Sequence, residues 1–343
     1  MHVLGRRTFL RGATATSIAA VAGLRPSQAA SEPPPETTTL KLLQFPSGCQ
    51  GPLYVADELL RSEGFTDVRY VKVEFTEGVT KALLHHEPLE SRTADLGLTF
   101  SAPLIGDIDR GVDLVTVGGV HAGCFVLFGN NGVRSVRDLR GKVVAVPMAD
   151  TQNTARMYIA SMAAYVGLDP TKDITWVTHP VDESTRLFAA GKVDAIMGFP
   201  PLAQELRAKK VGHVVVDSTS DRPWSQYFCC MMIANREFVK KNPVATKRTI
   251  RAIVKATAIC AREPERVARL LVERGVVKNY DYALQTVKEL PYARWRDYDS
   301  EDTLRFYALR LHEAGMIKSS PQKIISQGAE LRFINELKKE LKG

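Results

Sequence analysis

The chain has 343 residues, and its 46 lysines and arginines exceed its 38 aspartates and glutamates, giving a formal net charge of +8. No basic run with interleaved aromatic residues occurs, so the sequence does not predict a nucleic-acid-binding groove. Five irregularly spaced cysteines are too few for a disulfide framework. No segment after the N-terminal region is apolar over the roughly 20 residues that a membrane-spanning helix needs.

The first 29 residues have the pattern of an export signal: a basic start, a short apolar stretch and a small-residue end at 27–29. Within them, the segment Gly5-Arg6-Arg7-Thr8-Phe9-Leu10 resembles the twin-arginine signal, which directs folded proteins through a membrane. An uncleaved membrane anchor is disfavoured because the apolar stretch is too short. Cleavage after residue 29 removes four arginines and no acid, so the formal charge falls from +8 to +4. We expect a soluble periplasmic protein that begins with a proline-rich linker at 30–37.

After the linker, strands and helices alternate. Strands are predicted at 39–45, 68–75 and 94–100, and helices at 53–64 and near 78–86. Such alternation with short connections predicts a parallel sheet covered by helices.

The same order recurs further along the chain. Strands at 142–147, 174–180 and 192–199 alternate with helices at 154–167 and 182–191. The segments 93–103 and 192–202 also align at a constant offset, which matches Asp95 to Asp194 and Phe100 to Phe199. The repeated order predicts two βαβαβ units, one in each of two lobes.

Two segments must then cross between the lobes. The segment at 120–130 is the outward crossing, and 226–235 is the return, since a buried strand reads as a near-continuous apolar run. We expect lobe 1 to comprise 38–125 with 231–343, and lobe 2 to comprise 126–230. The last hundred residues carry no comparable strands and are expected to form a helical layer. Three helix starts are marked there by Asn242-Pro243, Asp299-Ser300 and Ser320-Pro321.

An export signal, two similar α/β lobes, the stretches DLRGKVVAV (138–146) and AGKVDAIM (190–197), and a helical tail occur together. In this combination the chain resembles a type II periplasmic substrate-binding protein of an ABC transporter, in the sulfonate/nitrate/taurine and thiamine-pyrimidine-precursor group. The resemblance implies two doubly wound lobes joined by a two-segment hinge. It also implies capture of a small organic or oxyanionic solute in the cleft between the lobes, and delivery to a membrane permease. We expect a monomer without catalytic residues, cofactor or metal, exported by the twin-arginine machinery.

Two alternatives share the same cleft. The fungal pyrimidine synthase of thiamine biosynthesis resembles this group and carries a cysteine-rich segment at a comparable place, with a histidine and pyridoxal phosphate consumed as substrates. Here only Phe228-Cys229-Cys230-Met231 stands at that place, which disfavours the enzyme. The other alternative is a solute sensor that signals to a membrane receptor.

Ligands of doubly wound sheets bind beyond the carboxyl ends of the strands, which places four loops at the cleft. These are 45–52, 99–103, 149–154 and 198–201, which supply glycines, hydroxyls, amides and aromatic rings. Arg156 is the only basic residue near them, so we do not expect a densely charged ligand. The candidate ligand-binding residues are Phe45, Ser47, Gly48, Cys49, Gln50, Ser101, His121, Thr151, Asn153, Thr154, Phe199 and Trp224.

Several of these residues have a structural reading beside the functional one. Ser101 caps the helix that follows it or offers its hydroxyl to a ligand, and Asp150 or Thr151 serves as the N-cap of the next long helix. Phe199 stacks on a ligand ring or packs in the core. The same choice between ligand and core applies to His121, Trp224 and Tyr227.

The adjacent cysteines Cys229 and Cys230 are read as small hydrophobic residues of the buried return strand. Their side chains point to opposite faces of a strand, so the pair does not chelate one metal, and a disulfide between neighbours would be strained. Because Cys49 and Cys124 stand near predicted cleft loops, a pocket lined with thiols stays open as a further reading.

Overall fold

The computed structural model describes residues 32–44, 47–72, 94–147 and 153–341, and residues 34–343 belong to one contact unit. The predicted signal, the predicted helix near 78–86 and the candidate residues Phe45 and Thr151 lie outside the described residues.

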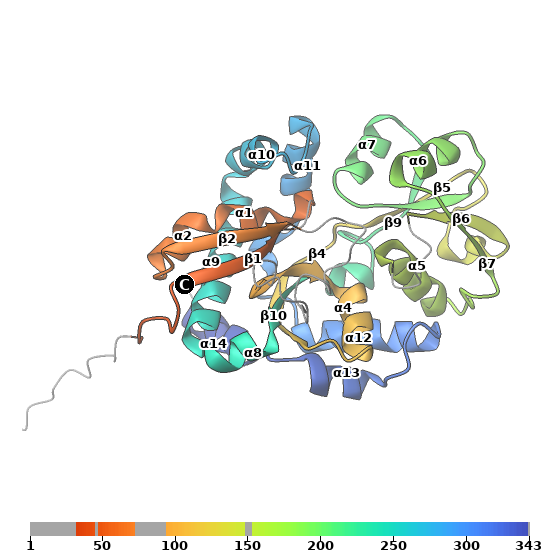
Figure 1. The fold of residues 1–343 in the computed structure, drawn as a ribbon. Coiled ribbons are helices and arrows are strands. Elements are labelled where there is room, and N and C mark those ends of the chain that lie inside the picture. Colours follow the sequence, from red (N-terminus) through yellow and green to blue (C-terminus); the bar gives the residue numbers. More distant parts are fainter. Residues whose placement is uncertain (1–31, 45–46, 73–93, 148–152, 342–343) are drawn as a thin grey trace, which may run out of the picture. The chain divides into compact units, whose positions relative to one another are not determined.

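Two five-stranded sheets form the framework (Figure 1). The first has the strand order β2-β1-β3-β10-β4 and the second the order β7-β6-β8-β5-β9. The strands of the first sheet are β1 (Thr39–Gln44), β2 (Asp67–Lys72), β3 (Leu96–Phe100), β4 (Leu114–Ala122) and β10 (Phe228–Asn235). Those of the second are β5 (Val126–Gly129), β6 (Lys142–Val146), β7 (Ile174–Thr178), β8 (Ala195–Gly198) and β9 (His213–Asp217).

The two sheets follow one plan, which confirms the repeat predicted from the sequence. The backbone N–H of Lys41 donates to Oδ2 of Asp95 at 2.7 Å, and the backbone N–H of Asp95 returns a bond to the Lys41 carbonyl at 2.7 Å. In the second sheet, Val143 and Asp194 make the same two bonds, each at 2.8 Å. The aligned aspartates therefore fasten the third strand of each unit to its first.

Each sheet departs from the expected all-parallel pairing at one strand. β1 pairs parallel with β2 and β3, as β6 does with β7 and β8, but β10 is antiparallel to β3 and β4. β5 is likewise antiparallel to β8 and β9. The reason is topological: β5 and β10 are the strands that follow the crossings at 123–125 and 218–227, so each enters its sheet from the other half of the chain.

The return strand β10 is buried as its apolar sequence predicted. The residues from Phe228 to Ala234 are at most 1% exposed. A strand in the middle of a sheet with both faces covered needs such an uninterrupted apolar run.

Helices pack beside both sheets. Among the described residues, the first half contributes α4 and a helix that breaks near Ala56 into two, where the sequence predicted one, and the second half contributes three. They are α1 (Gly51–Val55), α2 (Asp57–Ser62), α4 (Ser101–Asp109), α5 (Thr154–Tyr165), α6 (Val181–Ala189) and α7 (Leu202–Ala208). Short 3₁₀ turns are η1 (Gly48–Gln50), η2 (Val136–Leu139), η3 (Trp224–Gln226) and η4 (Tyr292–Arg294).

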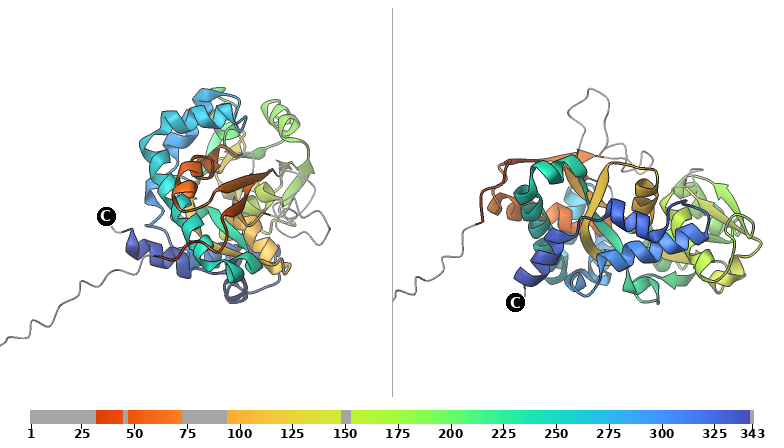
Figure 2. Two further views of the ribbon diagram at one scale, coloured as in Figure 1. Left: turned by 60° about the vertical axis from the view of Figure 1, so that its left-hand side comes forward. Right: turned by 90° about the horizontal axis from the view of Figure 1, so that it is seen from below.

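After β10 the described chain is helical, as expected, and its helices contact both halves. α12 packs on α4 and on α5, and α11 contacts α7; Figure 2 shows α11 and α12 in blue. The C-terminal layer therefore contacts helices that pack on the first sheet and helices that pack on the second. Its elements are α8 (Arg236–Lys241), α9 (Pro243–Arg262), α10 (Pro264–Glu273), α11 (Tyr280–Glu289), α12 (Ser300–Glu313), α13 (Pro321–Gly328) and α14 (Arg332–Glu340).

The three predicted helix starts are capped in different ways. Ser320 accepts a bond from the backbone N–H of Lys323, as predicted. Asp299, rather than Ser300, is the N-cap of α12, because its carboxylate accepts from a backbone N–H three residues on. α9 begins after Asn242 as predicted, but the side chain of Asn242 does not cap it.

The cap of α9 comes from the proline-rich segment instead. The carboxylate of Glu36 accepts bonds from the backbone N–H groups of Val244 and Ala245 at 3.0 and 2.9 Å. An anion at a helix N-terminus satisfies N–H groups that have no acceptor within the helix. Across the described ranges, no helix is both long enough and apolar enough to span a membrane.

Candidate ligand-binding site

A pocket of about 170 Å³ lies at the carboxyl edge of the second sheet. Its wall comes from the ends of β6 and β8 and from the first turns of α5, α6 and α7. The lining residues are Ala145, Pro147, Asn153, Thr154, Ala155, Val181, Ser184, Thr185, Ile196, Met197, Phe199, Pro200, Pro201 and Leu202. Three predicted residues, Asn153, Thr154 and Phe199, therefore stand together at the edge where ligands of doubly wound sheets bind.

Asn153 is the N-cap of α5. Its Oδ1 accepts a bond from the backbone N–H of Arg156 at 3.2 Å, and its side chain is buried. The expected cap at Asp150 or Thr151 is therefore wrong, because α5 begins only at Thr154. The first N–H groups of a helix have no acceptor within it, so α5 presents donors and a partial positive charge at the pocket.

The described lining is neutral. Of its hydroxyls, Ser184 donates to the carbonyl of His179 at 2.9 Å and Thr185 to that of Val181 at 2.8 Å, so both keep lone pairs as acceptors. No ionisable side chain is among the described residues that line the pocket. The guanidinium of Arg156 lies 4.9 Å from the centre of the Trp176 ring and is not part of the wall.

Phe199 combines its two predicted roles. It is only partly buried and lines the pocket, and its ring centre lies 5.0 Å from that of Phe100. Phe100 and Phe199 are the aligned strand-end residues of the two halves, so their contact joins the two carboxyl edges.

The predicted cleft loop that contains Gly48 also approaches the predicted cleft loop at 198–201. A Cβ atom built on Gly48 would lie 3.8 Å from Cβ of Pro200 and 3.1 Å from Cγ2 of Val277. This loop is closed in by the C-terminal layer, and Ser47, Gly48, Cys49 and Gln50 are all buried. The absence of a Cβ at Gly48 lets the two loops come close.

Gln50 carries an unsatisfied group. Its amide nitrogen donates to the carbonyl of Leu98 at 3.4 Å, whereas its Oε1 has no hydrogen-bond partner among the residues that the structure describes. Buried polar atoms are normally bonded, so this acceptor is an exception, and contact of Gln50 with a ligand stays a prediction.

Three other candidates lie in the core and do not line this pocket. Ser101 is the first residue of α4 but does not cap it, because its hydroxyl lies 3.0 Å from that of Tyr158. Trp224 is 3% exposed and packs edge-on against Phe306. His121 is fully buried. Their contact with a ligand stays a prediction.

His121 bridges two backbone carbonyls. Its Nδ1 lies 3.0 Å from the carbonyl of Ala122, and its Nε2 lies 3.1 Å from that of Cys49. The hydroxyl of Tyr292 donates to the same Cys49 carbonyl at 2.8 Å. The turn that carries Cys49 is therefore held from two sides.

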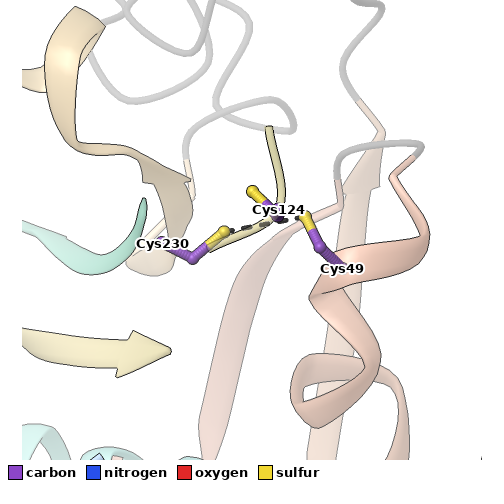
Figure 3. A group of neighbouring side chains, drawn as sticks. All are labelled: Cys49, Cys124 and Cys230. Atoms are coloured by element: carbon purple, nitrogen blue, oxygen red, sulfur yellow. Dashed lines mark hydrogen bonds between the residues drawn. The ribbon is translucent and has the colours of Figure 1, made fainter. Parts of the chain in front are cut away.

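The cysteines gather beside this turn (Figure 3). Cys124, on the outward crossing, forms a disulfide with Cys229 at the start of β10. Cys229 is buried in the return strand as predicted, but the disulfide was not predicted; it forms because the two crossing segments meet there. Cys230 points to the other side, and its sulfur lies 3.6 Å from that of Cys49.

The paired thiols Cys49 and Cys230 influence each other. The hydrogen bond from Cys230, with the nearby ring of His121, lowers the pKa of the Cys49 thiol despite its burial. Burial and the Cys49 sulfur raise the pKa of the Cys230 thiol. The pKa of the Cys49 thiol therefore lies below that of the Cys230 thiol.

Comparison with known proteins identifies the family of this chain. A sequence model of the NMT1/THI5-like family matches residues 51–267, well over half of the chain. The chain belongs to the NMT1/THI5-like family. A Brucella abortus protein, named as a binding protein, is 30% identical over 134 residues, which span 39% of this chain and 41% of that protein.

Solved structures of periplasmic binding proteins share the fold of this NMT1/THI5-like chain. The nitrate-binding protein NrtA of Synechocystis PCC 6803 superposes with a TM-score of 0.71 at 17% identity, covering 90% of both chains. The alkanesulfonate-binding protein SsuA of Xanthomonas axonopodis pv. citri, bound to MOPS, gives 0.65 at 18% identity, covering 86% of this chain and 99% of its own. The periplasmic binding-protein fold expected from the sequence is therefore confirmed.

Sequence reasoning missed one wall of the pocket. Val181, Ser184 and Thr185 belong to α6, which follows β7. Since β7 pairs parallel with β6, its carboxyl end reaches the same edge of the sheet. The signal was present in the sequence, because His179-Pro180 closes a predicted strand directly before a predicted helix.

Proposed function

We propose that this chain is the extracytoplasmic solute-binding component of an ABC transporter. It captures a small organic or oxyanionic solute and presents it to a membrane permease. The observation that carries the proposal is the neutral pocket of about 170 Å³ at the carboxyl edge of the second sheet, where α5 and α6 begin. The signal pattern at 1–29 supports export to the periplasm.

The lining indicates the chemistry of the solute. The N-terminal ends of α5 and α6 favour an anionic or polar head group, with Asn153 and Thr154 beside it. The remaining wall, with Ile196, Met197 and Phe199, suits a small apolar body. A sulfonate or carboxylate with a short apolar group satisfies both, and the names of the nitrate- and alkanesulfonate-binding structural neighbours support the oxyanion class.

Capture needs no covalent chemistry. The loop at Gly48 approaches Pro200, and Phe100 contacts Phe199, so groups of the first half pack against two of the residues that line the pocket. A ligand that contacts both halves stabilises the arrangement in which they meet, and a permease can recognise that arrangement. The lobe boundaries at 125/126 and 230/231 stay a prediction within this scheme.

The pyridoxal phosphate consumed by the fungal pyrimidine synthase does not fit the described part of this pocket. No lysine among the described lining residues offers an amine to its aldehyde. We therefore favour a binding protein over an enzyme, and no step of the scheme uses a cofactor.

The first experiment is native mass spectrometry of the purified protein, followed by a thermal-shift panel of nitrate, alkanesulfonates, small aromatic acids and pyrimidine amines. A ligand at 100 times its Kd stabilises the folded state by about 2.7 kcal/mol. We expect a saturable shift with an oxyanion and recovery of that ligand at unchanged mass. A ligand recovered in altered form would overturn the proposal in favour of an enzyme.

Two substitutions locate the site. Thr154→Val removes a hydroxyl from the pocket and should weaken binding about tenfold, whereas Thr175→Val, on an exposed position of β7, is the matched control and should leave it unchanged. Asn153→Asp keeps the helix cap but adds a negative charge, so it should abolish binding of an anion. If Asn153→Asp binds the ligand more tightly, the ligand is a cation and the oxyanion class is wrong.

A further inference from the structure

Three sulfur atoms from three separate segments meet beside the turn at Cys49 (Figure 3). Cys49 belongs to η1, Cys124 to the crossing between β4 and β5, and Cys230 to β10. Their Sγ atoms all lie within 4.8 Å of one another, with 3.6 Å between Cys49 and Cys230. The solute-binding scheme uses none of these sulfurs, and none lines the described pocket.

The spacing suits a single metal ion. With metal–sulfur bonds of about 2.3 Å, the sulfurs of a tetrahedral or trigonal site stand about 3.8 to 4.0 Å apart. The observed pair at 3.6 Å is within a few tenths of an ångström of that value, and the sulfur of Cys124 lies within 4.8 Å of both.

The surroundings favour a soft ion. Cys49 and Cys230 are fully buried and Cys124 is 5% exposed. No carboxylate or imidazole nitrogen among the described residues joins the three sulfurs within the same distance. Zinc sites normally complete four ligands, whereas Cu(I) accepts three thiolates in a plane, and soft thiolate ligands select it.

His121 and Tyr292 contact the residue Cys49 through its backbone and support the proposed site without supplying a ligand. Both contact the backbone carbonyl of Cys49 and so hold the backbone of the turn that carries it. The two ring nitrogens of His121 lie 3.0 Å from the carbonyl oxygen of Ala122 and 3.1 Å from that of Cys49, so the ring links β4 to the turn that carries Cys49.

From this arrangement we propose that Cys49, Cys124 and Cys230 form a trigonal Cu(I) site in the reduced chain. The disulfide between Cys124 and Cys229 prevents metal binding, because it occupies the sulfur of Cys124, one of the three proposed ligands.

Opening the site requires a reductant, which we assign to a dithiol. One dithiol supplies two electrons and two protons: the Cys124–Cys229 sulfur–sulfur bond breaks, two thiols form, and the dithiol leaves as its own disulfide. Binding of Cu(I) then replaces the thiol protons of Cys49, Cys124 and Cys230, which pass to solvent.

The test uses the full chain under argon. Thiol titration of the denatured protein should count five thiols after reduction and three before it. Cu(I) is supplied as its coloured bicinchoninate complex, and loss of colour reports transfer to the protein. We expect one Cu(I) per reduced chain, and at least tenfold less transfer to the disulfide form. X-ray absorption of the loaded protein should show three sulfur neighbours.

Single substitutions separate the proposed ligands from the other cysteines. Cys124→Ser should weaken Cu(I) binding at least tenfold in the reduced protein. Cys229→Ser removes the disulfide partner but no ligand, so this variant should bind Cu(I) without prior reduction. Cys260→Ser alters a buried free thiol outside the cluster and should leave transfer unchanged. Circular dichroism checks that each variant is folded.

Three outcomes would overturn the proposal. The first is reduced wild-type protein that leaves all copper with bicinchoninate although five thiols are counted. The second is equal binding by Cys124→Ser and Cys260→Ser. The third is a reduced chain that retains Zn(II) with four ligands and takes no Cu(I). Should Cys124→Ser fail to fold, Cys229→Ser still decides the matter, because it keeps all three sulfurs.

Discussion

Each of the two sheets has an edge at which its parallel strands end. The two edges are built on the same strand framework, but different side chains and loops cover them. Asp95 and Asp194 fasten corresponding strands with the same pair of bonds. At the first edge, Cys49, Gln50 and the ring of Tyr292 are buried together, whereas the second edge keeps an open pocket. The difference teaches that the repeated strands set the frame, while the loops and the C-terminal helices decide which edge stays accessible.

The largest expected contrast is between the aligned phenylalanines. Phe100 is 2% exposed, so Phe100→Ala should destabilise the fold by about 3–5 kcal/mol. Phe199→Ala should lower the unfolding free energy by much less, but weaken solute binding about tenfold, since its ring lines the pocket. Urea unfolding and ligand titration of both variants measure the two effects. Equal losses of unfolding free energy in Phe100→Ala and Phe199→Ala would contradict the assignment of Phe100 to the core and Phe199 to the pocket.

The second contrast concerns pH. Burial raises the pKa of the Asp95 carboxyl to about 6, although the bond from Lys41 lowers it. Because the folded pKa exceeds the ordinary value of 3.8, this group's stabilisation is complete below pH 3.8 and is lost as the pH rises through 6. The two-unit shift corresponds to about 3 kcal/mol.

Asp95→Asn should remove that fall in stability. Urea midpoints between pH 4 and pH 7 should drop for the wild type and stay level for the variant. Asp194→Asn is the matched substitution in the other sheet. If it flattens the profile as much as Asp95→Asn does, the assignment to Asp95 is wrong.

A third contrast lies in the glycines of the two aligned strands. A Cβ on Gly97 would come within 2.3 Å of Cβ of Leu43, whereas one on Gly198 would meet Cε2 of Phe128 at 3.0 Å. Gly97→Ala should therefore destabilise the protein by about 2 kcal/mol through overpacking, and Gly198→Ala by less. Thermal unfolding of both variants tests the order; a reversed order would show that the first edge is the looser one.

The smallest contrast is in helix capping. α5 has a side-chain cap at Asn153, whereas α4 has none. Asn153→Ala should cost about 1 kcal/mol, and Asn153→Asp should stay within a few tenths of the wild type because it restores the acceptor. Urea unfolding without ligand is the measurement. Equal losses of unfolding free energy in Asn153→Ala and Asn153→Asp would show that the side-chain cap does not stabilise α5.

Local sequence patterns predicted much of this structure. The apolar run at Phe228–Ala234 predicted a buried strand, and it is one. The offset that aligned Asp95 with Asp194 predicted a repeat that the hydrogen bonds confirm. The pocket walls at 153–154 and 199–201 followed from the rule that loops after parallel strands share one edge.

What escaped prediction depends on contacts between distant segments. Cys124 and Cys229 are 105 residues apart, and their bond exists because the two crossings meet. The cap of α9 comes from Glu36, more than 200 residues earlier in the chain. The antiparallel entry of β5 and β10 likewise follows from the path of the crossings, which no local pattern encodes.

The position of β10 has a consequence for biosynthesis. β10 lies between β3 and β4, and β4 has no other strand partner in the described sheet. A ribosome must therefore complete residue 235 before the first sheet can close, although the second sheet is already complete at residue 217. The half that is translated later is expected to fold earlier, and the exposed edges of β3 and β4 must wait, which makes the nascent chain vulnerable to aggregation over that interval.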